Sequence, residues 1–134
     1  MNQKERWEKA QQYEKNWWGK SSGEIKFGFY KDFAESLLKF TEGQININQK
    51  TQILEVGSGA GGIVTFLKES ENRYAIDPLE NFYSSVEDFT CQRDKTVNYF
   101  NAIGEEIPFE DSKFVLLIID FDRNYQSTTN YLLV

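Results

Sequence analysis

The chain has 134 residues and a net charge of −6, with 40% hydrophobic and 16% aromatic residues. This length suits a single domain with its own core, and no apolar run is long enough to cross a membrane. An acidic chain disfavours non-specific binding to phosphate backbones, so we expect a small-molecule or protein partner rather than nucleic acid.

The chain contains one cysteine, Cys91, and no histidine. A single cysteine cannot form an internal disulfide, and residues 1–20 lack the apolar stretch of a secretory leader, so we expect a cytoplasmic protein. We expect no metal site, since histidine is the commonest metal ligand in proteins.

Two helices are predicted in residues 1–45, which we expect to form an N-terminal helical cap. Apolar side chains recur at helical spacing over residues 3–18 and again over about 30–41, and glycines follow both segments. The apolar positions are Trp7, Ala10, Tyr13 and Trp17 in the first helix and Phe33, Leu37 and Phe40 in the second.

Strands and helices then alternate through residues 50–119, which is the pattern of an α/β domain. The predicted strands are 52–57, 73–77, 97–101 and 114–119, and the predicted helices are 61–70 and 81–90. The last strand has no polar alternation, as expected for a parallel strand covered on both faces. Right-handed crossovers give a Rossmann-like parallel sheet in the order 3-2-1-4, with a ligand cleft at the switch between strands 1 and 4.

The segment after the first strand is the most informative part of the chain. Gly57, Gly59 and Gly61 carry no Cβ and can take positive φ, so a ligand can lie against the backbone ahead of a helix N-terminus. Asp77 follows the second predicted strand, about twenty residues past Gly57. A carboxylate there can accept hydrogen bonds from ribose hydroxyls, and a helix N-cap is its alternative role.

Two ligand classes use such a loop, and the sequence satisfies both patterns. Gly57, Gly59 and Gly62 fit the dinucleotide pattern GxGxxG, whereas Glu55 with Gly57, Gly59 and Gly61 fits an acidic-x-GxGxG loop. The Glu55 carboxylate would repel a pyrophosphate but suits a cationic amino group, which favours S-adenosylmethionine over NAD. A structural role for Glu55, satisfied by loop amides, stays open.

Three motifs in this order resemble the class I S-adenosylmethionine-dependent methyltransferases, in particular their type 11-like domains. The motifs are the glycine loop after Glu55, the carboxylate of Asp77 and the segment GEEIPFEDS at 104–112. The resemblance covers about residues 50–119 and implies a cofactor-binding βαβ core there. It also implies methyl transfer from S-adenosylmethionine to a small-molecule acceptor.

The resemblance further implies which residues contact the cofactor. Glu55 is expected near the methionine amino group, Asp77 at the ribose and residues 102–104 along the adenine. Relatives usually carry an acidic residue at the position of Ile103 and an aspartate at that of Val115, so the chain departs from the family pattern at both. No catalytic residue is assigned. The expected cofactor-binding residues are Glu55, Gly57, Ser58, Gly59, Gly61, Asp77, Pro78, Ala102, Ile103, Gly104 and Asp120.

The family fold continues past its fourth strand with a fifth parallel strand and an antiparallel hairpin, whereas only residues 120–134 follow here. The resemblance therefore implies a partial methyltransferase domain with a truncated tail, in which residues 131–134 add at most a short antiparallel strand. Turnover by this chain is in doubt. The alternatives are a non-catalytic cofactor-binding or assembly module and, less favoured, an NAD-dependent oxidoreductase. An open edge on the fourth strand predicts self-association through that edge unless the tail covers it.

Overall fold

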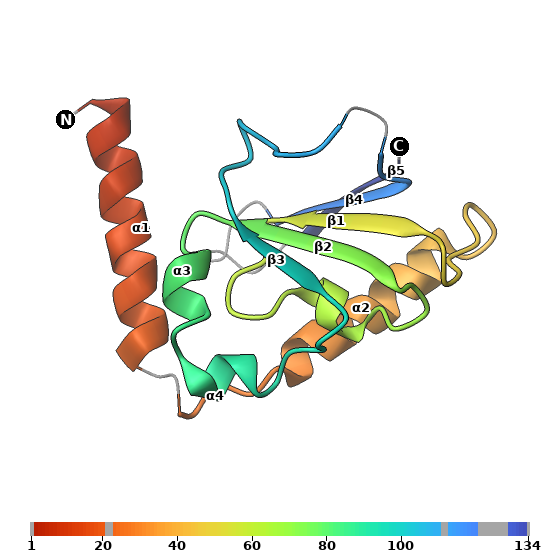
Figure 1. Ribbon diagram of the computed structural model, residues 1–134, viewed down its shortest axis with the longest axis horizontal. Helices are drawn as coiled ribbons and strands as arrows, with labels where there is room; N and C mark the ends of the chain where they lie inside the picture. The colour runs from red at the N-terminus through yellow and green to blue at the C-terminus, as the bar shows by residue number, and fades with distance from the viewer. Residues whose placement is uncertain (1, 21–22, 111–112, 121–128, 134) are drawn as a thin grey trace.

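The computed structural model describes residues 2–20, 23–110, 113–120 and 129–133, with Asp120 and residues 129–133 described as backbone only. In this part of the chain, a five-stranded sheet has helices packed against one face (Figure 1). The helices are α1 (Gln3–Lys20), α2 (Gly28–Thr41), the 3₁₀ helix η1 (Ile63–Phe66), α3 (Glu80–Tyr83) and α4 (Glu87–Thr90). The strands are β1 (Gln52–Val56), β2 (Asn72–Asp77), β3 (Asn98–Asn101), β4 (Leu116–Asp120) and β5 (Thr129–Leu133).

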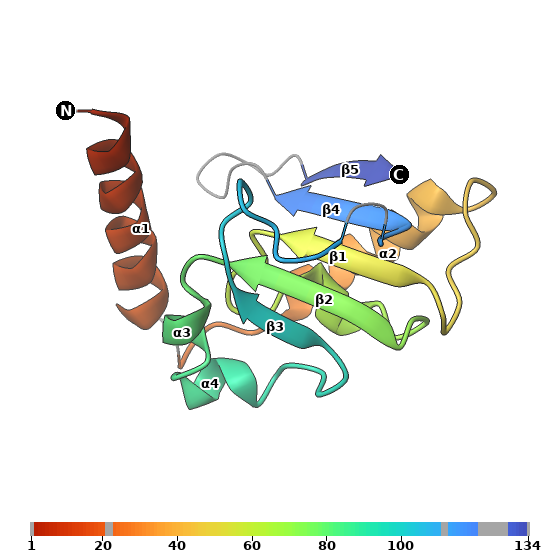
Figure 2. The same cartoon turned by 45° about the horizontal axis from the view of Figure 1, so that its top comes forward.

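The sheet has the strand order β3-β2-β1-β4-β5 (Figure 2). Strands β1 to β4 are parallel, which confirms the predicted Rossmann-like order 3-2-1-4. In central β1, Leu54 lies opposite Tyr74 of β2 on one side and Leu117 of β4 on the other. The carboxyl ends of these four strands therefore meet at one edge of the sheet, which is where this topology places ligands.

One face of the sheet packs on α2, η1 and α4 and forms the main core (Figure 1). Successive side chains of a strand point to opposite faces, so every second residue contributes to this core. The strands supply four hydrophobic side chains that have no exposed surface, and these are Ile53, Ala75, Leu116 and Ile118. Leu37 of α2 is equally buried against them.

The segment between β3 and β4 covers part of the opposite face. Tyr74, Phe100, Phe109 and Phe114 form an aromatic cluster with ring centroids 5.2 to 6.4 Å apart. The Lys113 ammonium lies 4.4 Å from the centroid of the Tyr74 ring, within the range of a cation–π contact. Phe100 remains 40% exposed, so this face is less completely buried than the face packed on the helices.

The C-terminal residues 129–133 form β5, which pairs antiparallel with β4. This confirms the prediction that the tail adds at most a short antiparallel strand. Because β5 covers the β4 edge, the predicted self-association surface on β4 is paired within the chain, and the outer edge of the sheet on this side belongs to β5. The rest of the predicted tail, residues 121–128, lies outside the described residues.

The predicted helix 61–70 is wrong, because only Ile63–Phe66 is helical, as the 3₁₀ helix η1. The carbonyls of Val64 and Thr65 accept hydrogen bonds from the Arg73 guanidinium at 2.6 and 3.3 Å. In an α-helix these carbonyls would accept hydrogen bonds from amides four residues further along. The buried arginine takes the place of those amides, so the segment continues in three-residue turns.

The predicted helix 81–90 is also wrong, because it is divided into α3 and α4. Val86 lies between them with an extended backbone, at φ −101° and ψ 109°. The Ser84 and Ser85 hydroxyls donate to the carbonyls of Asn81 and Phe82, three residues back. Such local hydrogen bonds compete with helical backbone bonds and favour a helix end.

Helix α1 is anchored through its last turns, beside α3 and the carboxyl edge of the sheet (Figures 1 and 2). Trp18 is 4% exposed and packs edge-on against Tyr83 and Phe89, with ring centroids 6.0 and 5.6 Å away. Lys15 lies over the Phe82 ring at 5.3 Å. The other aromatic side chains of α1 are exposed, so this helix buries one end only. No helix in the described ranges is both long and apolar enough to span a membrane.

Candidate functional site

The glycine loop joins β1 to η1 at the carboxyl edge of the sheet. Gly57, Gly59 and Gly62 have φ angles of 77°, 65° and 81°, a region that glycine adopts at no steric cost. Gly62, rather than the predicted Gly61, is therefore the third residue with a positive φ. The amides of Gly57 and Ser58 both donate to the Ile76 carbonyl, at 2.9 and 3.3 Å, which ties the loop to the end of β2.

Asp77 is the residue at which the loops after three strands meet. Its side chain is 4% exposed, and its Oδ2 accepts a hydrogen bond from the Gly59 amide at 2.9 Å. Its Oδ1 accepts from the Leu79 amide at 2.8 Å, and its backbone carbonyl accepts from the Ala102 amide at 3.3 Å.

Glu55 is fully buried beneath the glycine loop. Its Oε1 accepts a hydrogen bond from the Val64 amide at 3.0 Å. A Cβ at Gly62 would come within 2.8 Å of the same oxygen, so only glycine fits against it. These contacts agree with the structural alternative for Glu55, in which its carboxylate braces the loop. A role near a methionine amino group stays a prediction.

Two buried aromatic residues at the start of helix α2, the N-cap residue Phe27 and Tyr30, support the loop, and neither was predicted as a site residue. The Tyr30 hydroxyl donates to the Ser58 carbonyl at 3.1 Å. The Phe27 ring packs on Gly61, where an added Cβ would lie 2.2 Å from the nearest ring carbon. Ser58 itself is 1% exposed, and its hydroxyl has no hydrogen-bond partner in the part of the chain that the structure describes.

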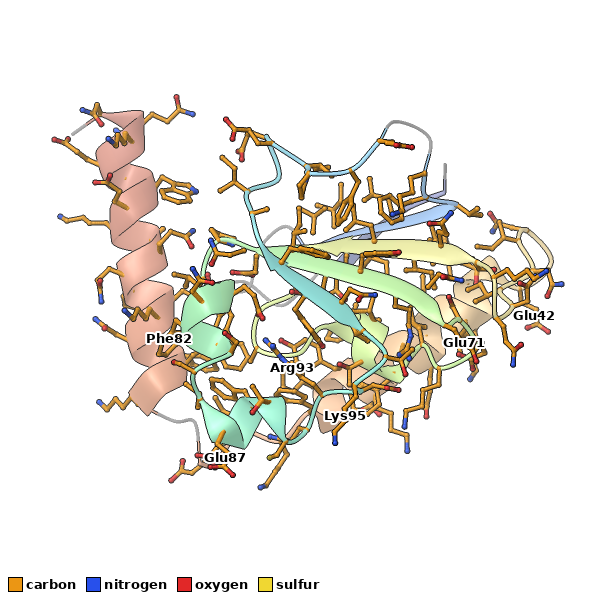
Figure 3. All side chains as sticks on the ribbon, viewed as in Figure 1. Glu42, Glu71, Phe82, Glu87, Arg93 and Lys95 are labelled. Carbon is orange, nitrogen blue, oxygen red and sulfur yellow. The ribbon has the colours of Figure 1, made fainter. Side chains whose placement is uncertain are left out.

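Arg93 connects the loop to α3 and was also missed. Its Nη1 and Nη2 donate to the two carboxylate oxygens of Glu80 at 2.9 and 2.7 Å, and its Nε donates to the Ala60 carbonyl at 2.8 Å. The guanidinium carbon lies 3.8 Å from the centroid of the Tyr99 ring. Figure 3 shows Arg93 close to the loop that links β1 and η1. The Arg93 and Glu80 side chains are 8% and 6% exposed, so water screens this ion pair weakly.

Tyr99 of β3 holds the next carbonyl of the loop. Its hydroxyl donates to the Gly61 carbonyl at 2.5 Å, and the Thr65 hydroxyl donates to the same carbonyl at 3.2 Å. The Thr65 Oγ1 also lies 2.7 Å from the Tyr99 hydroxyl oxygen, within hydrogen-bond distance. Burial raises the pKa of the Tyr99 hydroxyl, against the opposing effects of this hydrogen bond and the Arg93 charge. The phenol is therefore neutral at neutral pH and remains a hydrogen-bond donor.

The other predicted residues lie at the same edge of the sheet. A Cβ at Gly104 would be 3.1 Å from Cγ1 of Val56, so the segment after β3 passes over the end of β1. Ile103 and Pro78 are half-buried. Asp120 is the last residue of β4, and its side chain lies outside the described atoms. The structure thus brings the predicted residues of the first three loops together and leaves the contribution of Asp120 a prediction.

Comparison with known proteins returned no relative. No family model matches the chain, and neither a curated protein nor a solved structure matches it. Within the described ranges, no three His, Cys, Asp or Glu side chains are grouped to hold a metal ion. The candidate site is therefore a glycine loop held by the two buried carboxylates Glu55 and Asp77.

Proposed function

We propose that this chain binds S-adenosylmethionine at the carboxyl edge of its sheet and provides the cofactor half of a site for methyl transfer to a small molecule. The observation that carries the proposal is the placement of Asp77, whose buried carboxylate lies where the glycine loop and the loops after β2 and β3 converge. A carboxylate at the end of the second strand of this fold suits the hydroxyls of a ribose.

The loop geometry favours S-adenosylmethionine over a dinucleotide. A pyrophosphate is usually bound by free loop amides and by the N-terminus of the helix that follows. Here η1 has four residues, and four amides of the loop region already donate within the chain. They belong to Gly57, Ser58, Gly59 and Val64. Two buried carboxylates beside the loop would also repel a pyrophosphate.

The buried polar groups around the loop fit a nucleoside ligand. The Ser58 hydroxyl has no partner among the described residues, and a buried hydroxyl left unpaired costs about 1 to 3 kcal/mol. A polar group of the ligand would satisfy it. Asp77 would accept ribose hydroxyls, and the backbone of residues 102–104 would lie along the base.

Methyl transfer requires mainly that the chain bind the cofactor and orient the acceptor. S-adenosylmethionine supplies a sulfonium methyl group, which is already a strong electrophile. Transfer then depends mainly on an acceptor held in line at contact distance. We assign no residue as a base. The single cysteine leads us to place this activity in a reducing cytoplasm.

Calorimetric titration of the purified chain with S-adenosylhomocysteine tests the proposal, with NAD as the competing ligand. Asp77→Asn should weaken binding at least about tenfold, because a charge-assisted hydrogen bond contributes about 1.5 to 3 kcal/mol. Asp94→Asn is a matched control. Asp94 Oδ1 also accepts the amide two residues ahead, that of Thr96 at 2.9 Å, and its Oδ2 accepts from Arg73 at 3.1 Å.

The control variant should change the affinity by less than about twofold. A folded wild-type chain that fails to bind S-adenosylhomocysteine, or equal losses in the two variants, would reject the proposal. Tighter binding of NAD would favour the oxidoreductase alternative. Binding without transfer to any acceptor would correspond to the non-catalytic module.

A further inference from the structure

The second half of the glycine loop is held by its carbonyl oxygens. The Ala60 carbonyl accepts a hydrogen bond from Arg93, and the Gly61 carbonyl accepts from Tyr99 and Thr65. These donors come from β3, from η1 and from the segment that leads into β3. We infer that Arg93 and Tyr99 are positioning residues that fix the peptide planes between residues 60 and 62. The expected effect on ligand affinity rests on the function proposed above.

Because the peptide unit is planar, the hydrogen bonds to these carbonyls also fix the direction of the amides that follow them. In a trans peptide the carbonyl of one residue and the amide of the next point in opposite directions. The carbonyls of Ala60 and Gly61 point toward Arg93 and Tyr99, so the amides of Gly61 and Gly62 point away from them. Within the described residues, neither amide has an acceptor. The direction of both amides is thus set by contacts outside the loop.

Arg93 suits this role because its guanidinium is held on two sides, by Glu80 and by the Tyr99 ring. Two donors of the guanidinium are bound by both oxygens of Glu80, and its face lies on the Tyr99 ring. Such a fork–fork pair fixes the plane of the guanidinium, which leaves Nε aimed at the Ala60 carbonyl. A lysine would keep the charge but lose this geometry.

A second buried arginine in the chain provides the comparison. Arg73 pairs with Asp94 and also donates to backbone carbonyls, but these belong to Val64 and Thr65 of η1. Both arginines are therefore buried ion-pair partners that bind backbone oxygens. Only Arg93 binds an oxygen of the glycine loop.

The experiment uses Tyr99→Phe, which removes the hydroxyl and keeps the ring beneath Arg93. The matched control is Tyr74→Phe, which removes a tyrosine hydroxyl on the opposite face of the sheet. Thr65→Val removes the second donor to the Gly61 carbonyl with little change of shape, and serves if Tyr99→Phe does not fold. Arg93→Lys and Arg73→Lys form the second matched pair. Each variant is measured by the amide NMR signals of Gly61 and Gly62 without ligand and by titration with S-adenosylhomocysteine.

We expect Tyr99→Phe and Arg93→Lys to shift the Gly61 and Gly62 signals and to weaken binding about threefold to tenfold, the usual effect of one hydrogen bond. Tyr74→Phe should leave both measurements unchanged, and Arg73→Lys should lower stability while changing affinity less than about twofold. Unchanged Gly61 and Gly62 signals in Tyr99→Phe and Thr65→Val would overturn the inference. Shifted signals with unchanged affinity, in a chain that binds the ligand, would overturn the expected effect of this geometry on binding.

The ligand-free signals separate this inference from the proposed function. If the wild-type chain does not bind S-adenosylhomocysteine, the proposed function fails. The shifts in Tyr99→Phe and Arg93→Lys would then still show that these residues set the loop geometry. Their absence would overturn that role independently of any ligand.

Discussion

The contact between Phe27 and Gly61 allows a sharp test of how the glycine loop is packed. An added Cβ at Gly61 would lie 2.2, 2.7 and 2.9 Å from three carbons of the Phe27 ring, whereas apolar carbons prefer about 3.5 to 4.0 Å. The ring cannot move away easily, because it is 2% exposed and packs against Tyr30 and Phe89 with centroids 5.1 and 6.4 Å away. Gly61→Ala should therefore overpack this part of the core.

The expected cost of Gly61→Ala is about 1 to 3 kcal/mol of unfolding free energy, the usual range for overpacking. For a chain of this size, that lowers Tm by roughly 3 to 15 °C. Backbone strain adds nothing, because Gly61 is not among the glycines with positive φ. In a chain that already carries Phe27→Ala, the same change should be neutral or even stabilise, since alanine restricts the unfolded chain more than glycine does.

Urea unfolding followed by circular dichroism measures all four members of this double-mutant cycle. Phe27→Ala alone should cost about 3 to 5 kcal/mol, and Phe27→Leu replaces it if that variant is unfolded. The cycle isolates the contact, because Gly61 and Phe27 interact directly. If Gly61→Ala is neutral in the wild-type chain, or costs the same with and without the Phe27 ring, the packing of Phe27 on the loop is refuted.

Three further predictions concern other contacts. Gly62→Ala should destabilise the fold by about 1 to 3 kcal/mol, because its φ of 81° and ψ of 162° lie in a region that only glycine adopts readily. The clash with Glu55 Oε1 adds to this cost. Urea unfolding measures the effect, and an unchanged midpoint contradicts the prediction. Burial alone would raise the pKa of Asp94, but the Thr96 backbone hydrogen bond and Arg73 hold it below the usual value. The ionised Asp94 carboxylate therefore stabilises the fold fully above about pH 4, and this stabilisation is lost as pH falls through the folded-state pKa. Asp94→Asn should reduce the change of unfolding free energy with pH below about pH 4. An equal pH dependence in the variant and the wild-type chain contradicts this. Self-association should occur through the outer edge of β5, as light scattering across a concentration series would detect, and a strict monomer at high concentration excludes it.

The strands and the two N-terminal helices were predictable from local pattern, whereas the two helices between the strands were not. The apolar runs of β1, β2 and β4 are bounded by turn residues, so their existence, order and direction follow from the sequence. The helices at 61–70 and 81–90 failed for different reasons. Arg73 replaces helical amides from nine residues away, and serine hydroxyls end α3 locally. The first cause is tertiary and leaves no trace in the periodicity of the segment itself.

Some residues of the candidate site could likewise be predicted from local sequence, and others could not. The glycine loop and Asp77 follow from spacing, because a strand, a turn and the next strand fix both positions. Phe27, Arg93 and Tyr99 reach the loop from segments about thirty residues before or after it, and no local motif marks them. One signal was present. Arg73 occupies a buried position of β2 between two half-buried residues, and Glu55 lies in the buried centre of β1; a charge at such a position indicates a partner elsewhere.

The central position of β1 has a consequence for how the chain is synthesised. Ile53 of β1 pairs with Leu116 of β4, a partner about sixty residues later in the chain. At about 5 to 20 residues per second, a ribosome needs roughly 3 to 13 s to produce that partner. During this time β1 can pair with β2 but exposes its other, apolar edge. Of the five strands that the structure describes, β1 has the longest interval between its own synthesis and that of its second neighbour. We therefore expect chaperones to bind the nascent chain mainly at β1.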